Sequence, residues 1–467
     1  MQTCSLAVDI GASSGIVTAG FIEDGKLKLN EIHRFENKLI EKNNSFCWDI
    51  DKLFTEIKKG IQRTKELGYK PDSIGIDTWA VDFVLLDEND ELITDAVAYR
   101  DPRTKGMMEE VFSLINKEYL YSKTGIQFQK FNTIYQLFYL KKNKPEILEK
   151  AKTFLMIPDY LNFLLTGKKV NEYTNATSTQ LVNAFTKKWD MELLRELGIN
   201  TQMFQKITPP KTSLGHLKTE LKNELSFDME VILPATHDTG SAVLAVPELE
   251  DTIYISSGTW SLIGVENKTP ICGSKALDYN FTNEGGVDYR FRFLKNIMGL
   301  WMIQEVKRHF NDKYSFAMFA EMAEEIKDFH SKVNVNDNRF LKPKNMIKEI
   351  QLYCKETNQP VPQSPGEIAK CVFDSLADSY QAAVFEIEEI KGKKYSKINI
   401  IGGGSKNEML NQLIADTTGK LVVAGPSEAT AIGNIAAQLI ALKKIKNTGE
   451  ARSIISESFD LMTYTAN

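Results

Sequence analysis

The same short pattern occurs twice in this chain: an apolar stretch, a turn of glycine and hydroxyl residues, and a second apolar stretch. The first copy covers residues 6–10, the turn 11–15 and residues 16–21; the second covers 252–255, 256–259 and 260–265. This order predicts a β-hairpin rather than a strand that leads into a helix. Because the copies lie about 245 residues apart, we expect the chain to contain two related halves.

Helices and strands alternate between and after the two hairpins. A helix is expected over residues 53–61, capped by Asp49 or Asp51 and closed near Gly68 and Pro71. Strands are expected at 73–77, 81–86 and 231–233. Towards the C-terminus, a strand at 397–401, a helix at 407–418, a strand at 421–424 and a helix from about 428 to 442 follow one another. This alternation predicts an α/β fold, with a mixed sheet covered by helices.

The length of the chain predicts more than one domain. A chain of 467 residues is too long for a single ordinary hydrophobic core. We expect one domain over residues 1–243 and a second over residues 244–467. No low-complexity linker separates them, so the two domains are expected to pack closely and to hinge.

The composition excludes several classes of protein. With 42% hydrophobic residues, 25% charged residues and a formal net charge of −5, it is typical of a soluble globular protein. Lys and Arg are scattered, which argues against a nucleic-acid or membrane partner.

The N-terminus does not resemble a signal peptide, and no apolar run approaches the roughly 18 residues of a membrane span. A cytoplasmic location is expected, with the five dispersed cysteines reduced even if Cys354 and Cys371 meet.

Three turns are candidates for contact with a nucleotide. Small residues at 11–15 and again at 256–259 let backbone N–H groups approach phosphate oxygens. Asp9, at the end of the strand before the first turn, is a candidate for holding a hydrated Mg²⁺. The glycines at 402–404 leave room for a flat ring or a ribose beside a helix N-terminus. The alternative for each segment is an ordinary structural turn.

Known nucleotide-binding motifs are missing from the chain. No Gly-Lys pair is followed by Ser or Thr, so the phosphate-binding loop of many ATPases is absent. The motifs of protein kinases are also absent. If this chain uses ATP, we expect it to hold the nucleotide through the small-residue turns.

The best candidate for a catalytic group is Asp238, which follows the strand expected at 231–233. A carboxylate there can act as general base for a hydroxyl group in phosphoryl transfer, and His237 can donate a hydrogen bond to a polyol. The alternative is that Asp238 caps the following helix. Trp79, Ala80 and Asp82 suit the wall of a sugar pocket, but each has an equally simple structural interpretation. The same holds for Asn296 as an N-cap and for Gln304 as a surface helix residue.

Taken together and in this order, the segments resemble the FGGY carbohydrate kinases. The resemblance covers nearly the whole chain and implies two actin-like ATPase (ribonuclease H-like) domains with an interdomain cleft. It also implies a cytoplasmic enzyme that transfers phosphate from ATP, with Mg²⁺, to a sugar. The matching segments are residues 7–15, 73–79, 81–87, 158–160, 172–177, 256–262, 282–286, 295–301, 402–404 and 433–435.

The resemblance also implies a substrate. The expected reaction converts L-rhamnulose and ATP into L-rhamnulose 1-phosphate and ADP, with L-fuculose as the alternative acceptor. Actin-like filament proteins, chaperone-type ATPases and inactive sugar sensors are more distant alternatives. The oligomeric state is left open, and neither a nucleic acid nor a membrane is expected as partner.

The resemblance further implies a role for individual residues. Asp238 is expected to be the catalytic base at the sugar O1. The other expected sugar contacts are Ala80, His237, Thr239 and Asn296. The expected nucleotide contacts are Ala12, Ser13, Ser14, Gly15, Ile16, Thr259, Gln304, Gly402 and Gly403. The chain departs from the family pattern twice, since Ile16 stands where Arg is usual and Ala80 where Gly is usual.

Overall fold

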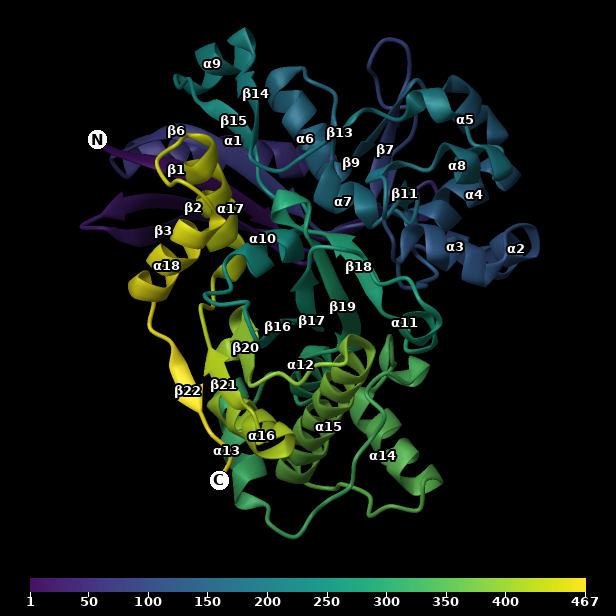
Figure 1. Ribbon diagram of the computed structural model, residues 1–467, viewed down its shortest axis with the longest axis vertical. Helices are drawn as coiled ribbons and strands as arrows, with labels where there is room; N and C mark the ends of the chain where they lie inside the picture. Colours follow the sequence, from purple (N-terminus) through teal and green to yellow (C-terminus); the bar gives the residue numbers. More distant parts are fainter. The chain divides into compact units, whose positions relative to one another are not determined.

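The computed structural model describes all 467 residues, which form two compact units (Figure 1). The first unit contains three separate segments, Met1–Pro247, Glu266–Phe293 and Ala429–Ser458. The second contains Glu248–Val265, Leu294–Glu428 and Phe459–Asn467. The spatial units are therefore discontinuous in sequence. The expected boundary between residues 243 and 244 describes domains that are continuous in sequence, and it stays a prediction.

The first unit is built on a six-stranded sheet in the order β14-β15-β6-β1-β2-β3. β1 pairs antiparallel with β2, which confirms the predicted hairpin, and parallel with β6. β6 in turn pairs parallel with β15. The strands are β1 (Gln2–Ile10), β2 (Ser14–Glu23), β3 (Lys26–Glu36), β6 (Tyr69–Thr78), β14 (Thr212–His216) and β15 (Glu230–Leu233).

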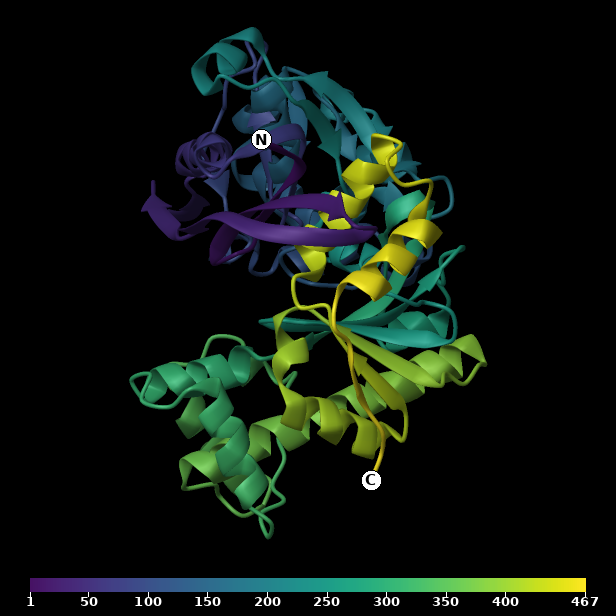
Figure 2. The same cartoon turned by 90° about the vertical axis from the view of Figure 1, so that its left-hand side faces the viewer.

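The two faces of this sheet differ in character because successive residues of a strand point to opposite sides. Leu6, Val8 and Ile10 of β1 belong to an apolar core that also contains residues of α1 (Ile50–Glu66), α6 (Ile157–Thr166) and α9 (Thr219–Leu225). As predicted, Asp49 is the N-cap of α1. The other face, with Asp9, is covered by α17 (Ala429–Ala441) and approached by α10 (Asp238–Leu244). Figure 2 shows α17 and α18 (Thr448–Ser458) beside the hairpin strands.

A second apolar core lies within the same unit, among helices inserted between the strands of the sheet. Its buried side chains include Tyr135, Phe154 and Leu193. The elements that form this part are β7 (Phe83–Leu86), α2 (Met107–Leu114), α3 (Lys117–Thr124), α4 (Thr133–Asn143), α5 (Pro145–Lys150), β9 (Thr153–Met156), α7 (Tyr173–Thr177) and α8 (Met191–Glu196).

The second unit repeats the strand arrangement of the first. Its sheet contains the order β19-β17-β16-β20-β21-β22. Again the first strand pairs antiparallel with the second, here β16 with β17, and parallel with β20, which pairs parallel with β21. The strands are β16 (Thr252–Ser257), β17 (Trp260–Asn267), β19 (Phe291–Met298), β20 (Lys397–Ile401), β21 (Leu421–Ala424) and β22 (Met462–Tyr464). The last two residues of β17 and the first three of β19 are counted with the first unit.

Position by position, the order β3-β2-β1-β6-β15-β14 corresponds to β19-β17-β16-β20-β21-β22. In both sheets the last strand runs antiparallel to its neighbour. The two halves predicted from the repeated hairpin are therefore confirmed, and so is the α/β class. The helices of the second unit are α12 (Trp301–His309), α13 (Phe316–Glu325), α14 (Met346–Glu356), α15 (Pro365–Lys391) and α16 (Glu408–Thr418).

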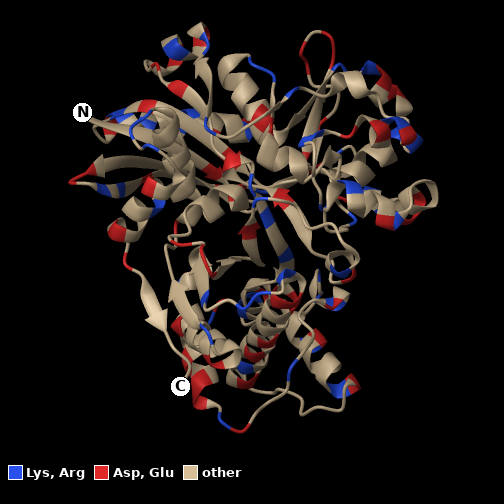
Figure 3. Ribbon diagram, viewed as in Figure 1, with Lys and Arg blue, Asp and Glu red and all other residues tan.

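Basic and acidic residues are interspersed along the ribbon (Figure 3). None of the helices is both long enough and apolar enough to cross a bilayer. All five cysteines are free thiols.

Candidate active site

Three parallel strands of the first unit bring the candidate catalytic residues to one edge of the sheet. β1, β6 and β15 are neighbours, and the carboxyl ends of parallel strands meet at the same edge. Asp9 lies at the end of β1, Asp77 at the end of β6, and His237 and Asp238 follow β15. His237 forms an isolated parallel bridge with Thr78. The sheet therefore gathers side chains that are far apart in the sequence.

Asp9 and Asp77 are direct partners in the parallel pairing of β1 with β6. Asp77 is fully buried, and Asn434 of α17 donates to its Oδ2 at 2.5 Å. Burial and repulsion from Asp9 raise the pKa of Asp77 well above its ordinary value. The other oxygen, Oδ1, is buried and accepts no hydrogen bond. Two adjacent carboxyl groups of this kind need a proton or a cation between or beside them.

This pair fits a hydrated magnesium ion. Mg²⁺ prefers oxygen ligands, and it usually keeps several waters while binding one or two carboxylates and the phosphates of a substrate. No group of three or more His, Cys, Asp or Glu residues is arranged to hold a metal. Asp9 and Asp77 would supply the carboxylate oxygens to such a partly hydrated ion.

Asp238 is the first residue of α10, and its N-cap is His237. Asp238 is therefore not the N-cap residue of this helix, although its side chain accepts a backbone N–H of the first turn. The backbone N–H and the hydroxyl of Thr239 both donate to Asp238 Oδ1, at 2.6 and 3.1 Å. Desolvation raises the pKa of Asp238, while the Thr239 hydrogen bonds and the Arg292 charge oppose the shift. Its side chain is 30% exposed, so it combines raised basicity with access for a substrate.

His237 lies between Asp238 and two charged residues that the sequence did not single out for this role. Its Nε2 is 3.4 Å from Asp238 Oδ1, and its Nδ1 is 2.9 Å from Arg292 Nη2. Glu284 Oε2 lies 3.4 Å from the same Nδ1. Burial and then the charge of Arg292 lower the pKa of His237 well below its ordinary value. The imidazole is therefore neutral near pH 7.

The backbone before His237 is held in place by Glu172, from one of the segments that resemble the kinase family. Thr236 donates to Glu172 Oε2 through its backbone N–H at 3.1 Å and its hydroxyl at 2.7 Å. Asp159, from another such segment, accepts from the Glu172 N–H at 3.1 Å. Both carboxyl groups are fully buried. Hydrogen bonds to these two segments therefore fix the backbone that leads into His237 and Asp238.

Trp79 and Asp82 have structural roles in this fold. Asp82 Oδ2 accepts from the indole N–H groups of Trp48 and Trp79, at 2.6 and 2.9 Å, and from the Tyr99 N–H at 3.0 Å. Both residues are buried. Ala80, between them, is partly exposed. Its role as a sugar contact stays a prediction.

The first small-residue turn is a tight hairpin in which the Gly11 N–H donates to the Ser14 carbonyl at 2.9 Å. Residues 12–14 are at least partly exposed, as phosphate contact requires. A Cβ atom at Gly15 would overlap the Phe35 ring, so this glycine is also needed for packing. Ile16 lies opposite both Asp9 and Arg34 in the sheet.

In the second unit, the other hairpin turn contacts the triple-glycine turn. Gly402 has φ +83°, and a Cβ there would lie 2.9 Å from the Ser257 carbonyl oxygen. A Cβ at Gly404 would overlap Ser257 Oγ. Gly403 has open space beside it. Two of the three glycines are therefore required for close approach to the turn after β16.

The same turn also meets the start of α12. The Trp301 N–H donates to the Thr259 carbonyl at 3.1 Å, and Leu300 donates to Gly258 at 3.0 Å. Gln304 lies one turn further along this helix and is partly exposed. The structure thus brings together the three segments that carry the predicted nucleotide contacts of the second unit, Thr259, Gln304, Gly402 and Gly403.

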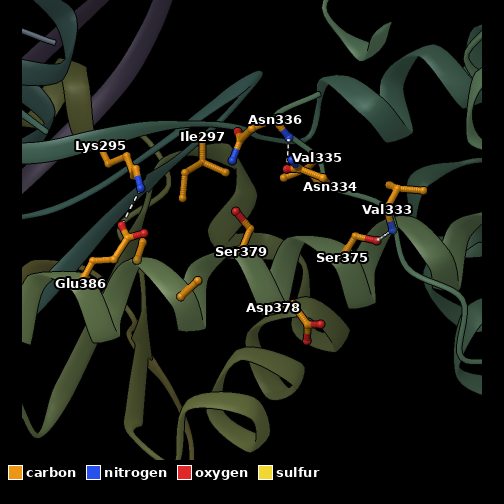
Figure 4. Close-up of a pocket in the computed structure, with 12 residues that line it drawn as sticks. Lys295, Ile297, Val333, Asn334, Val335, Asn336, Ser375, Asp378, Ser379 and Glu386 are labelled. Carbon is orange, nitrogen blue, oxygen red and sulfur yellow. Dashed lines mark hydrogen bonds and ion pairs between the residues drawn. The ribbon is translucent and has the colours of Figure 1, made fainter. Parts of the chain in front are cut away.

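Asn296 lies within β19, so its alternative role as an N-cap is wrong. Its neighbours Lys295 and Ile297 line a cavity of about 280 Å³ between β19 and α15. Figure 4 shows these two side chains directed towards the helix that carries Ser375, Ser379 and Glu386. Because neighbours on a strand face opposite sides, Asn296 faces away from this cavity. None of the predicted site residues lines it.

Two comparisons by sequence agree on the kind of protein to which this chain is similar. Residues 4–245 match the model of the FGGY family of carbohydrate kinases, N-terminal domain, and residues 253–442 match that of its C-terminal domain. A rhamnulokinase from Oceanobacillus iheyensis is 69% identical over 464 residues, which cover 99% of this chain and 98% of the relative. A rhamnulokinase from Bacillus subtilis is 48% identical over 461 residues, covering 98% and 94%.

Solved structures share the fold at low sequence identity. A ligand-bound xylulose kinase from Lactobacillus acidophilus aligns with a TM-score of 0.82 at 19% identity, covering 100% of this chain and 94% of that one. A Plasmodium falciparum glycerol kinase with ADP aligns with a TM-score of 0.79 at 15% identity, covering 100% and 95%. At this identity the likeness establishes the two-domain fold alone.

Proposed function

Because the chain belongs to the FGGY family of carbohydrate kinases, we propose that it transfers the terminal phosphate of ATP to O1 of L-rhamnulose. The products are L-rhamnulose 1-phosphate and ADP. The rhamnulokinases that match it over nearly its full length support this substrate. The observation that carries the chemistry is the carboxylate of Asp238, which is oriented by Thr239 and raised in pKa by burial.

In this proposal Asp238 is the general base. Thr239 occupies Oδ1 with two hydrogen bonds, which leaves Oδ2 to accept the proton from the sugar O1. A carboxylate with a raised pKa is a better base near neutral pH than an exposed one. As the proton moves to Asp238, O1 bonds to the γ-phosphorus of ATP and the bond from that phosphorus to the bridging oxygen breaks. Ala80, His237, Thr239 and, from the second unit, Asn296 are the proposed sugar contacts.

We assign the nucleotide to the small-residue turns. Residues 12–16 are proposed phosphate contacts, and Thr259, Gln304, Gly402 and Gly403 are proposed contacts to the rest of ATP. Within the second unit, the close packing of Ser257 against Gly402 and Gly404 supports a common role for the turn after β16 and the glycine turn.

The proposed metal is Mg²⁺, held through water by Asp9 beside Asp77. When bound, it would neutralise charge on the phosphate oxygens. Because ATP is supplied in the cytoplasm, we also propose that the enzyme works there.

Steady-state kinetics with a panel of ketoses tests the proposal. L-rhamnulose, L-fuculose and D-xylulose are each supplied with ATP and Mg²⁺, and ADP release is followed by a coupled assay. We expect kcat/KM to be highest for L-rhamnulose, and phosphorus NMR to identify a 1-phosphate as the product. A higher kcat/KM for L-fuculose would reassign the substrate within the family. ATP hydrolysis that no sugar stimulates would contradict a sugar kinase altogether.

A further inference from the structure

Arg292 of β19 is completely buried, and its guanidinium group contacts the imidazole of His237. Its side chain is 0% exposed, its Nε donates to the Gly285 carbonyl at 2.9 Å, and its Nη2 lies 3.1 Å from Glu284 Oε2. The same Nη2 is 2.9 Å from His237 Nδ1. These residues come from β18 (Thr282–Gly285), β19 and the segment before α10, and all belong to the first unit.

The chemistry of this contact fixes where the imidazole proton is. A guanidinium group has only donors and does not lose its proton in proteins. A hydrogen bond from Nη2 to Nδ1 therefore requires a lone pair on Nδ1. A neutral imidazole whose Nδ1 accepts must carry its hydrogen on Nε2.

We propose that Arg292 is a positioning residue that holds His237 as the Nε2–H tautomer, so that His237 presents a fixed donor beside the carboxylate of Asp238. The proposal rests on the proposed function in so far as the donor serves a sugar. His237 then selects an acceptor oxygen of the ketose, while Asp238 accepts a proton from a neighbouring hydroxyl. One residue can only donate at this point and the next can only accept, which orients the polyol.

The surrounding charges agree with this assignment. Glu284 Oε2 lies nearer to Arg292 Nη2, at 3.1 Å, than to His237 Nδ1, at 3.4 Å. The carboxylate is therefore neutralised mainly by the guanidinium, and it does not draw a second proton onto the imidazole. On the other side of the ring, Asp238 Oδ1 faces Nε2 at 3.4 Å, where it favours a hydrogen on that nitrogen.

The arrangement is not the one that stability alone would favour. Arg292 Nη1 is buried without a hydrogen-bond partner, and an unsatisfied buried donor destabilises the folded state. Buried ion pairs are often replaceable by apolar residues without loss of stability. A charged group kept here at such a cost argues for a chemical role.

Nitrogen NMR of the wild-type enzyme tests the proposal without any substituted residue at Arg292. The chain has only five histidines, and His237→Gln identifies the resonances of His237 by their disappearance. In long-range ¹H–¹⁵N spectra at pH 7, without sugar or ATP, we expect Nε2 to be protonated and Nδ1 to be unprotonated. A proton on Nδ1, or on both nitrogens, would overturn the proposal. Because no sugar is present, this result is independent of the substrate.

Substituted enzymes then test the consequence for the substrate. Arg292→Met combined with Glu284→Gln removes both buried charges together, and Arg292→Lys keeps a donor and the charge. For the double variant we expect kcat/KM for the sugar to fall about 10- to 100-fold, the size of effect found when a partner that fixes the tautomer of a metal-binding histidine is removed. We expect an unchanged KM for ATP and His237 signals that report a mixture of tautomers.

Arg292→Lys should recover part of the sugar kinetics and the single tautomer. Lys420→Met is the matched control, since it removes the cation from another largely buried ion pair, that with Glu388. It should leave the His237 signals unchanged. A folded double variant with normal sugar kinetics and a single Nε2–H tautomer would overturn the proposal. An inactive wild-type enzyme with the expected tautomer would instead contradict the proposed function.

Discussion

Asp9 and Asp77 stand directly opposite each other on two parallel strands, and Asp77 is completely buried with one oxygen unpartnered. Two neighbouring carboxyl groups repel each other when both are ionised. The fold nevertheless maintains this pair, and Asn434 of α17 donates a hydrogen bond to the other oxygen of Asp77, Oδ2. A pair of this kind is suited to a cation that comes and goes with a nucleotide.

Asp77→Asn should therefore weaken the binding of Mg²⁺ without lowering the thermal stability of the protein. The substitution removes one negative charge beside Asp9, and a unit charge a few ångströms from a cation contributes at least about 1 kcal/mol. We expect the Mg²⁺ concentration for half-maximal rate to rise about fivefold or more, with thermal stability unchanged or increased. The measurement is a Mg²⁺ titration of the initial rate at saturating ATP and sugar. Asp72→Asn, on the same strand and paired with Lys444, should leave the titration unaltered; equal titrations for both variants would contradict a metal at this pair.

Asp238→Asn tests the general base. The amide keeps the size of the side chain but cannot take up the proton of the sugar hydroxyl. We expect kcat to fall about 10²- to 10⁴-fold, the usual contribution of general acid–base catalysis, while KM for ATP changes little. Coupled ADP detection measures the rate, and Asp278→Asn on an exposed part of α11 (Ser274–Asp278) serves as control. Near-normal turnover by a folded Asp238→Asn enzyme would show that another group is the base.

The local patterns of the sequence were sufficient for most of the framework. β20 (Lys397–Ile401) and β21 (Leu421–Ala424) have the predicted bounds, because each apolar stretch lies between clear turn signals. The two hairpins were also predicted, since apolar residues flank glycine turns in both. Strand ends extend beyond the prediction in β1 and β6, where polar residues continue the pairing and hydropathy gives no signal.

The partners within the candidate site could not be predicted in this way. Arg292 contacts His237 across 55 positions of sequence, and Asn434 contacts Asp77 across 357. No periodicity connects such residues, because their proximity depends on the register of paired strands and on which helix covers the sheet. For Asp82 the sequence left the choice open, and burial under two indole groups decides for a structural role. The roles of the predicted contact residues stay predictions until they are tested.

Gly404→Ala should weaken nucleotide use selectively. The new Cβ would overlap Ser257 Oγ and lie 2.6 Å from Ser257 Cβ, so the turn after β16 must move. We expect KM for ATP to rise about tenfold and stability to fall by about 1–3 kcal/mol, the usual effect of overpacking. KM for the sugar should be unchanged. Ser257→Gly in the same chain removes both overlapping atoms and should restore part of the lost affinity; no such rescue would mean that Gly404 acts in another way. Gly273→Ala, with open space around it, is the control.

Asp159 provides a prediction on pH. Burial raises its pKa from 3.8 to about 8, so between these values the folded protein keeps a proton that the unfolded chain has lost. Stability from this group is complete below about pH 4 and is lost as the pH rises through about 8, at up to about 1.4 kcal/mol per pH unit. Asp159→Asn has no such proton. The variant loses the hydrogen bond that Asn171 donates to Asp159, which lowers the free energy of unfolding by about 1 kcal/mol at every pH. It also lacks this part of the pH dependence. Thermal unfolding of both proteins between about pH 4 and pH 8 should show the wild type losing stability relative to Asp159→Asn as the pH rises, until the variant is the more stable protein, whereas parallel curves would mean that Asp159 is ionised throughout.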